Sequence, residues 1–294
     1  YMKSTVKKIV TAELGAVLLS AICMLTACTD APDSSEYEAE KIDGGVSLIV
    51  KRDRQVIDIY AVTSVKKPIT VPIKGGIPLR IESGERTSIP LIQTGTKLIL
   101  KGNIIELTCT NNDLTALNVQ GVPALQKLDC SGNELTSLDV HGLTALTDLV
   151  CSKNLLSLLK VHDLKALQSL DCSDNRLALL DIQGLPALEN LTCSGNQLSS
   201  LNVQNLNALS KLDCSYNQLN AHAFTTLFNN LPTRSDLVYD SARCYVYGEV
   251  PGKTENNCKN FSSPENLKTA FEKAKTVKKW EMLKWRTKDE SEEL

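Results

Sequence analysis

The sequence has few aromatic residues, no excess of one charge and no apolar run long enough to cross a membrane. Aromatic residues make up 4% of the 294 residues, whereas hydrophobic residues make up 42%. The core must therefore be built mainly from leucine, valine, isoleucine and cysteine. The formal net charge of −2 does not suggest the basic face that nucleic-acid binding usually needs, so we expect no nucleic-acid partner.

The apolar stretch near the start of the chain is short. It covers residues 14–25, about 12 residues, whereas a membrane-spanning helix needs roughly 20. The basic residues Lys3, Lys7 and Lys8 precede it, which is the arrangement of a secretory signal peptide. We expect residues 1–27 to direct export and then to be removed.

This stretch ends in the sequence Leu-Thr-Ala-Cys at residues 25–28, which resembles the lipobox of bacterial lipoproteins. The resemblance implies cleavage after Ala27 and attachment of acyl chains to Cys28, which then anchors the protein to a membrane. Cys23 is a poorer candidate, because Ile22 is too bulky for the cleavage position. An ordinary signal peptide with an incidental cysteine is the alternative interpretation.

Residues 28–43 are acidic and polar, and such a composition predicts a flexible tether. An acidic stretch directly after the lipidated cysteine also resembles the surface-export signal of lipoproteins in Bacteroides-like Gram-negative bacteria. That resemblance implies a bacterial outer-membrane lipoprotein exposed at the cell surface.

The chain repeats itself every 21 residues between about residues 104 and 219, with the consensus LxxLxCxxNxLxxLxVxxLxx. Each unit carries one cysteine, an asparagine three residues later and a leucine two residues after that. The cysteines are Cys109, Cys130, Cys151, Cys172, Cys193 and Cys214. The asparagines are Asn112, Asn133, Asn154, Asn175, Asn196 and Asn217.

The spacing within the unit predicts how one coil folds. The residues around each cysteine alternate with a period of two, which predicts a short strand with leucine and cysteine pointing inward. The asparagine amide is expected to satisfy backbone groups in the turn that follows. Burial of about seven apolar side chains stabilises one coil by roughly 2 kcal/mol each. Ordering the backbone of 21 residues costs about 1–2 kcal/mol per residue, so a single coil cannot fold alone. The coils must therefore stack, with capped ends.

This pattern resembles the leucine-rich repeats of the internalin-J-like group, in which cysteine replaces an inward leucine and forms a ladder. Similar repeats occur in surface proteins of anaerobic Gram-negative bacteria. The resemblance covers about residues 104–219 and implies a leucine-rich-repeat solenoid of short parallel β-strands. Internalin-J-like proteins are anchored to the cell wall and have more repeats, whereas this chain has a lipobox, so the resemblance informs the fold more than the anchoring.

The segments on either side of the repeats are predicted to form two caps. The repeats themselves are assigned to residues 106–219. Residues 44–105 predict a β-rich N-terminal cap, with strands at 46–50, 55–62, 67–73, 78–83 and 96–102. Residues 220–283 predict an α+β C-terminal cap, with helices at 221–230 and near 264–276 and strands at 244–247 and 279–283. We expect residues 284–294 to form a disordered tail.

The cysteines of the repeats are predicted to be buried, reduced thiols. Neighbouring strands lie about 4.8 Å apart, whereas the Cβ atoms of a disulfide prefer about 3.8 Å, and zinc ligands converge as closely spaced pairs. Cys244 and Cys258 do not follow the repeat, and an exported chain can form disulfides. A Cys244–Cys258 disulfide is therefore left open, and no cofactor is predicted.

Two histidines share one position of the repeat. His141 and His162 are 21 residues apart, at the position that Gln120, Gln183 and Gln204 occupy in other coils, so they should stack on one edge. A metal pair is an alternative, but no carboxylate recurs beside both, and we predict no metal site. Because no Ser-His-Asp order, phosphate loop or HExxH motif occurs, we expect no catalytic residues and no enzyme.

The outward positions of the strands are the remaining candidate site. The candidate ligand face comprises Lys127, Asp129, Asp148, Asp171, Asn190, Lys211, Asp213 and Tyr216. Binding faces are usually rich in Tyr, Trp and Arg, and Tyr216 is the only aromatic residue expected here, so a merely solvated face is the competing interpretation. We expect a monomer that recognises a protein or a glycan. A structural envelope lipoprotein without a ligand is the alternative, and an enzyme comes third.

Overall fold

The structure is a computed structural model that describes residues 39–73, 77–91, 97–234, 242–287 and 289–294. Residues 1–38 lie outside the described residues. They include the expected signal peptide with Cys23, the expected lipidation site Cys28 and the first part of the expected tether, residues 28–38. Within the described residues, no helix combines the length and the apolar character needed to cross a membrane.

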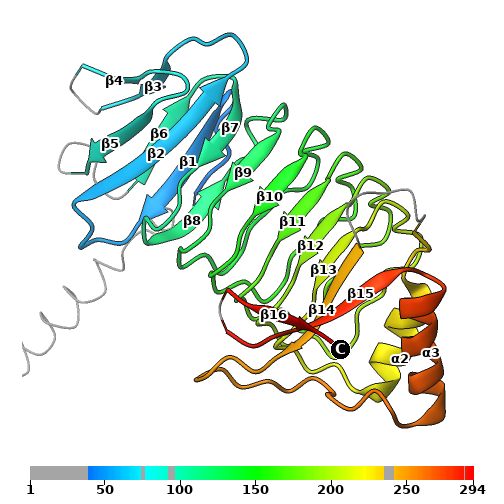
Figure 1. Cartoon of the computed structure of the whole chain (residues 1–294). Helices are drawn as coiled ribbons and strands as arrows, with labels where there is room; N and C mark the ends of the chain where they lie inside the picture. Colours follow the sequence, from blue (N-terminus) through cyan, green and yellow to red (C-terminus); the bar gives the residue numbers. More distant parts are fainter. Residues whose placement is uncertain (1–38, 74–76, 92–96, 235–241, 288) are drawn as a thin grey trace, which may run out of the picture. The chain divides into compact units, whose positions relative to one another are not determined.

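The repeats form one parallel sheet with a strand from each coil, as predicted for a leucine-rich-repeat solenoid (Figure 1). Each central leucine pairs with the leucine 21 residues later, so the period of the sequence becomes the register of the sheet. The inward leucines and cysteines of these strands are at most 1% exposed. The strands are β7 (Ile104–Thr108), β9 (Lys127–Asp129), β10 (Asp148–Val150), β11 (Ser169–Asp171), β12 (Asn190–Thr192) and β13 (Lys211–Asp213).

The asparagines form a second ladder that ties each coil to the preceding one. The Nδ2 of Asn154 donates to the carbonyl oxygens of Cys130 and Cys151 at 3.0 and 3.1 Å. Its Oδ1 accepts from the amide of Leu135 at 3.0 Å. The same set of partners recurs around the asparagines of the neighbouring coils. The amide thus satisfies buried backbone groups that the turn would otherwise leave unpaired.

The N-terminal cap pairs a strand with each side of the first coil. β2 (Val56–Thr63) pairs antiparallel with β7 and extends the repeat sheet, while β1 (Gly45–Val50) pairs antiparallel with β8 (Leu114–Asn118). Buried and more exposed side chains alternate along β2, because one face of this strand covers the core and the other faces outward. The other cap strands are β3 (Ile69–Val71), β4 (Leu79–Ile81), β5 (Arg86–Pro90) and β6 (Lys97–Lys101).

Two features of this cap differ from the sequence prediction. β5 was not expected; it ends in Pro90 and forms the edge of the repeat sheet, where a missing amide hydrogen is tolerated. Residues 39–43, expected to belong to the flexible tether, are held by the cap instead. The Nδ2 of Asn118 donates to the carbonyl oxygen of Ala39 at 3.1 Å, and Lys97 pairs with Glu40 at 2.9 Å.

The C-terminal cap continues the sheet and covers its last coil with two helices (Figure 1). β14 (Ala242–Gly248) and β15 (Trp280–Trp285) add parallel strands beside β13. α2 (Ala221–Asn230) begins where Asn220 accepts a hydrogen bond from the amide of Ala223, and α3 (Glu265–Thr276) packs nearby. The four phenylalanines of the chain form one cluster here, with ring centroids 5.0–5.6 Å apart.

The end of the chain contradicts the expected disordered tail. β16 (Ser291–Glu293) pairs antiparallel with β15, and the amide of Leu294 donates to the carbonyl oxygen of Met282 at 2.8 Å. A charged composition predicted disorder, but the exposed edge of β15 offers unpaired backbone groups that a returning strand can satisfy.

Candidate ligand-binding face

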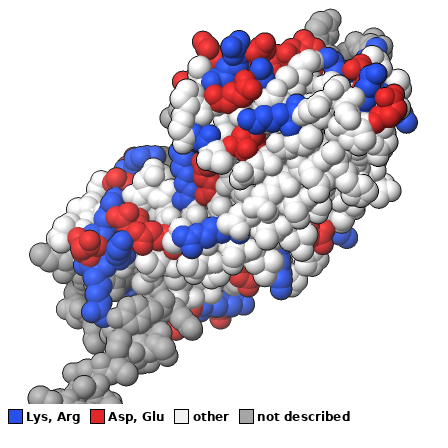
Figure 2. Space-filling view, turned by 90° about the horizontal axis from the view of Figure 1, so that it is seen from below, with Lys and Arg blue, Asp and Glu red and all other residues white. Residues whose placement is uncertain are grey.

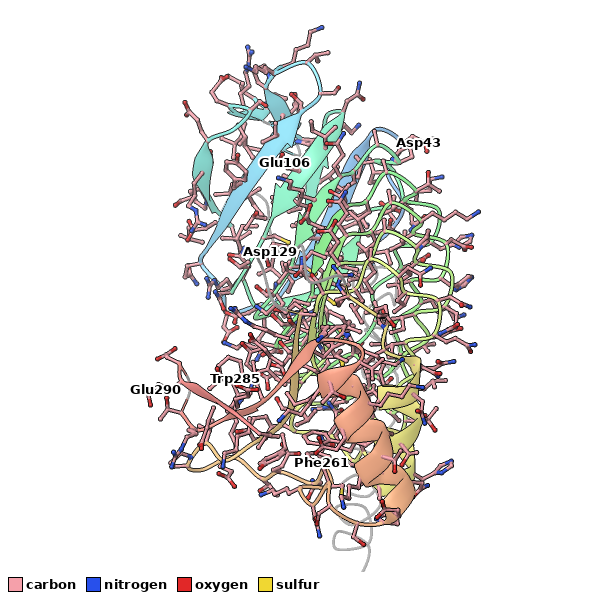
Figure 3. All side chains as sticks on the ribbon, turned by 45° about the vertical axis from the view of Figure 1, so that its right-hand side comes forward. Asp43, Glu106, Asp129, Phe261, Trp285 and Glu290 are labelled. Carbon is pink, nitrogen blue, oxygen red and sulfur yellow. The ribbon has the colours of Figure 1, made fainter. Side chains whose placement is uncertain are left out.

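The outward side chains of the strands form two straight rows across the repeats. Lys127, Asp148, Asn190 and Lys211 lie in one row, and Asp129, Asp171 and Asp213 lie in the other. Figure 3 shows Glu106 and Asp129 on the side of the sheet toward which Trp285 also lies, lower down in that view. The structure therefore brings most of the candidate ligand face together on one surface, which we call the strand face.

The three aspartates of the second row are engaged in their own turns. The Oδ1 of Asp129 accepts from the amide of Ser131 at 3.0 Å and from its hydroxyl at 2.7 Å. Asp171 and Asp213 make the same pair of bonds to Ser173 and Ser215. Such bonds shape a local turn. The three serines, each of which directly follows a ladder cysteine, thus stabilise the ends of their strands.

Asp213 and Tyr216 are not on an open surface, contrary to the sequence prediction. Asp213 is 7% exposed, and its burial raises the pKa of the carboxyl group above the ordinary value, although bonds from Ser215 oppose the rise. The amide of Tyr216 donates to Oε2 of Glu255 at 2.8 Å, and its phenolic oxygen accepts from the amide of Val250 at 3.1 Å. The loop after β14 therefore covers this end of the strand face.

This covering depends on Gly248. A Cβ atom there would lie 2.0 Å from the phenolic oxygen of Tyr216, far inside contact distance. Glu255 completes the arrangement, because its Oε2 also accepts from the amide of Gly248 at 2.7 Å. Burial raises the pKa of the Glu255 carboxyl group, while hydrogen bonds from Asn257, Tyr216 and Gly248 lower it.

The C-terminal cap supplies the aromatic surface that the repeats lack. Tyr245 is the register partner of Asp213, and Trp285 stacks on it with centroids 4.4 Å apart and planes 10° apart. The indole Nε1 of Trp285 donates to Oδ2 of Asp213 at 3.1 Å. Sequence reasoning missed Trp285, because the strand expected at 279–283 ended two residues before β15 does. The apolar residues Leu283 and Trp285, two apart, were the available signal.

A cavity of about 170 Å³ lies where the strand face meets this cap. It opens beside the stacked pair, with the carboxyl group of Asp213 in its wall. The residues that line it are Ser194, Asp213, Ser215, Tyr216, Val250, Lys253, Trp285 and Thr287.

The histidines lie on the opposite edge, and a carboxylate does contact both of them, contrary to the sequence interpretation. One oxygen of Asp163 lies 2.8 Å from Nδ1 of His141 and 3.2 Å from Nε2 of His162. A second cavity, of about 650 Å³, includes both histidines in its lining. Among the described residues, no group of three or more His, Cys, Asp or Glu side chains is arranged to hold a metal ion.

Every cysteine in the described part of the chain has a free thiol, including the pair for which the sequence left a disulfide open. Cys244 is fully buried in β14 and interacts with the thiol of Cys214, while Sγ of Cys258 lies 3.4 Å from the carbonyl oxygen of Asn260. The alternation of β14 turns Cys244 into the core and toward the ladder. Burial raises the pKa values of the ladder thiols, that of Cys130 to about 12.

One ladder residue escaped the sequence analysis altogether. The Nδ2 of Asn257 donates to the carbonyl oxygens of Cys214 and Val246 at 2.9 and 2.8 Å, and its Oδ1 accepts from the amide of Leu219 at 2.8 Å. These are the bonds of a ladder asparagine, but Asn257 lies outside the 21-residue period, so no sequence signal indicated it.

No protein-family model matches the chain, and no curated protein matches it. Among solved structures, it is similar to the functional domain of InlJ from Listeria monocytogenes, which includes a cysteine ladder, with 27% identity and a TM-score of 0.40 over 58% of this chain and 34% of that one. It is also similar to the internalin InlF from Listeria monocytogenes, with 18% identity and a TM-score of 0.35 over 51% of this chain and 52% of that one. The chain thus spans about a third to a half of these proteins. Because both TM-scores lie below 0.5, the functional proposal rests on the residues of this chain.

Proposed function

We propose that the protein is a membrane-anchored lipoprotein, exposed at the bacterial surface, that recognises a protein or glycan ligand through its strand face. The observation that carries this proposal is the placement of Trp285. Its ring is stacked on Tyr245 and held by Asp213 beside rows of mostly polar and charged side chains. A rigid aromatic residue next to polar groups is the usual composition of a binding hot spot.

The rigidity of this group favours binding. Stacking and the indole hydrogen bond already hold Trp285 in one position, so little side-chain entropy remains to be lost when a ligand binds. Acidic and basic side chains are interspersed over the molecular side shown in Figure 2 and form no patch of one sign there. The strand face itself carries both signs, with Lys127 two residues from Asp129, so we expect short-range contacts to dominate there, with micromolar affinity at best and added avidity from many copies on one membrane.

The test is to obstruct the middle of the strand face without disturbing its turns. Val150 lies between Asp129 and Asp171 in the outward row, and the valine side chain makes no hydrogen bonds. Val150→Arg in the full-length protein should weaken binding to epithelial cells, or to an array of matrix proteins and glycans, at least tenfold. Ser200→Arg is the matched control, because Ser200 is exposed in the half of its coil that follows the asparagine turn. Equal binding by the two variants would rule out the strand face.

The membrane anchor is proposed from the sequence at residues 25–28. Cys28→Ala should release the protein from the membrane fraction and change its mass. Protease added to intact cells should degrade the wild-type protein if it is exposed at the surface. Membrane association that is unchanged in the variant, or full protection from protease, would contradict this part of the proposal.

The second candidate is a structural envelope lipoprotein without a specific ligand. It is favoured by the turn bonds of Asp129 and Asp171, because these give the polar rows a role in the fold itself. This candidate predicts that Val150→Arg leaves every binding assay unchanged while deletion of the protein alters envelope integrity. We propose no catalytic role, since the sequence contains no motif for one.

A further inference from the structure

We propose that the cavity at the C-terminal end of the strand face binds one uncharged sugar ring. This inference rests on the proposed function, because it names the ligand class for one part of the same face. It follows from the size of the cavity, from the groups in its wall and from the charges around it.

The size of the cavity limits what can enter. Its volume of about 170 Å³ lies well below the roughly 300–1,000 Å³ of sites that enclose drug-sized molecules. One pyranose ring or one amino-acid side chain is therefore the largest group that it can hold. The rest of a ligand would lie along the strand face, which continues from Asp213 toward Asp171.

The wall combines an aromatic ring with hydrogen-bond acceptors. Trp285 offers apolar surface, and Ser194 and Thr287 offer hydroxyl groups. Among the residues that the structure describes, Ser215 donates two bonds to Oδ1 of Asp213, whereas Oδ2 accepts only one, from Trp285. A carboxylate oxygen has two lone pairs, so Oδ2 keeps one acceptor position. A buried carboxylate binds hydroxyl donors strongly, and a sugar presents such donors around an apolar C–H face.

The surrounding charges disfavour ionic ligands of either sign. The Nζ of Lys253 lies 5.1 Å from the centroid of the Tyr216 ring and 3.8 Å from Oδ1 of Asp174, at the margin of the cavity. A cationic side chain entering there would be repelled by Lys253. An anionic sugar would meet the carboxyl groups of Asp213 and, behind Tyr216, Glu255. A neutral, hydroxyl-rich ring avoids both penalties.

The experiment uses the full-length protein and the methyl glycosides of glucose, galactose, mannose and N-acetylglucosamine. Saturation-transfer NMR and tryptophan fluorescence should show binding of at least one of them. Trp285→Phe should abolish the fluorescence change, because the only other tryptophan, Trp280, is 2% exposed. Asp213→Asn should weaken the binding at least tenfold. Asp181→Asn is the control, because Asp181 also accepts a bond from a backbone amide of its own turn, that of Gln183, but lies outside the cavity and the strand face, and it should change binding less than twofold.

The inference is overturned if none of the four glycosides binds, or if binding survives both Asp213→Asn and Trp285→Phe in folded protein. Preferential binding of Nα-acetyl-lysine amide or of glucuronate would also overturn it. These outcomes are distinct from failure of the proposed function, which Val150→Arg tests separately. A ligand that is lost in Val150→Arg while no glycoside binds keeps the strand face as a recognition surface and removes only the sugar site.

Discussion

The repeats and the C-terminal cap contribute strands to the same sheet, but their sequences specify those strands in different ways. In the repeats, an asparagine every 21 residues ties each coil to the one before it. In the cap, Asn257 makes the equivalent bonds although it follows Asn217 by 257 − 217 = 40 residues. The comparison shows that the backbone groups of the last coil impose the same requirement, whether or not the sequence repeats.

The repeats and the C-terminal cap also contribute different kinds of side chain to the strand face. The repeats supply mostly polar and charged side chains in straight rows, and the cap supplies Tyr245 and Trp285 at one end. The stacked aromatic pair beside this face therefore comes from the end of the solenoid and not from its repeated coils.

The largest effect should come from breaking the ladder inside the repeats. Asn175→Ala would leave the carbonyl oxygens of Cys151 and Cys172 and the amide of Leu156 buried without this partner. We expect the free energy of unfolding to fall by about 3–5 kcal/mol, measured by urea denaturation. Asn190→Ala on the strand face is the control and should change stability by less than about 0.5 kcal/mol. Similar losses in both variants would contradict the ladder's role.

Replacing the equivalent asparagine of the cap by alanine should lower the free energy of unfolding by a smaller amount. Asn257→Ala removes the partner of Cys214, Val246 and Leu219, and we expect a loss of about 2–3 kcal/mol. The loss is smaller because the end of a solenoid can open without unfolding the other coils. Hydrogen exchange should therefore accelerate in β14 and β15 more than in β9 and β10. Uniform acceleration through all coils would show instead that cap and repeats unfold as one unit.

The cysteines of the repeats and of the cap should differ in how fast they react with alkylating reagents. The buried Cys172 should be alkylated slowly in the native protein, whereas the partly exposed Cys258 of the cap should react first. Cys172→Ser should lower stability by about 1–3 kcal/mol, because the buried hydroxyl group would need a partner. Mass spectrometry of the alkylated protein checks the order of reaction. Disulfides between ladder cysteines, or equal rates at both sites, would contradict the packing role.

The smallest expected effect is a pH dependence at the junction of the two regions. Burial raises the pKa of Asp213 in the folded protein above its ordinary value, so the folded state binds the proton more tightly than the unfolded state. Stability should therefore decrease as pH rises from the unfolded pKa of about 3.9 through the raised folded value. Asp213→Asn should flatten this decrease in urea titrations at several pH values, and Asp129→Asn should preserve it. An unchanged slope in Asp213→Asn would assign the pH dependence to other groups.

The parts of this protein that depend on local or periodic patterns were predictable from the amino-acid sequence. The 21-residue period specified the inward leucines and cysteines, the register of the parallel strands and the asparagine ladder, because identical coils can bury their apolar faces only by stacking in register. The helix that begins after Asn220 was also predictable, since its N-cap and apolar spacing are local features. The outward rows followed from the alternation of each strand.

The contacts between residues that are far apart in the chain and outside the 21-residue period became visible only in the folded protein. Folding brought Trp285 to Asp213, turned Cys244 toward Cys214 and placed Asn257 in the ladder. It also set β16 against the edge of β15, although the composition of that segment predicted disorder. Each of these contacts depends on the path by which the cap returns to the last coil. That path is selected by the unpaired backbone groups and apolar surface of the coil, and no repeated signal in the sequence records it.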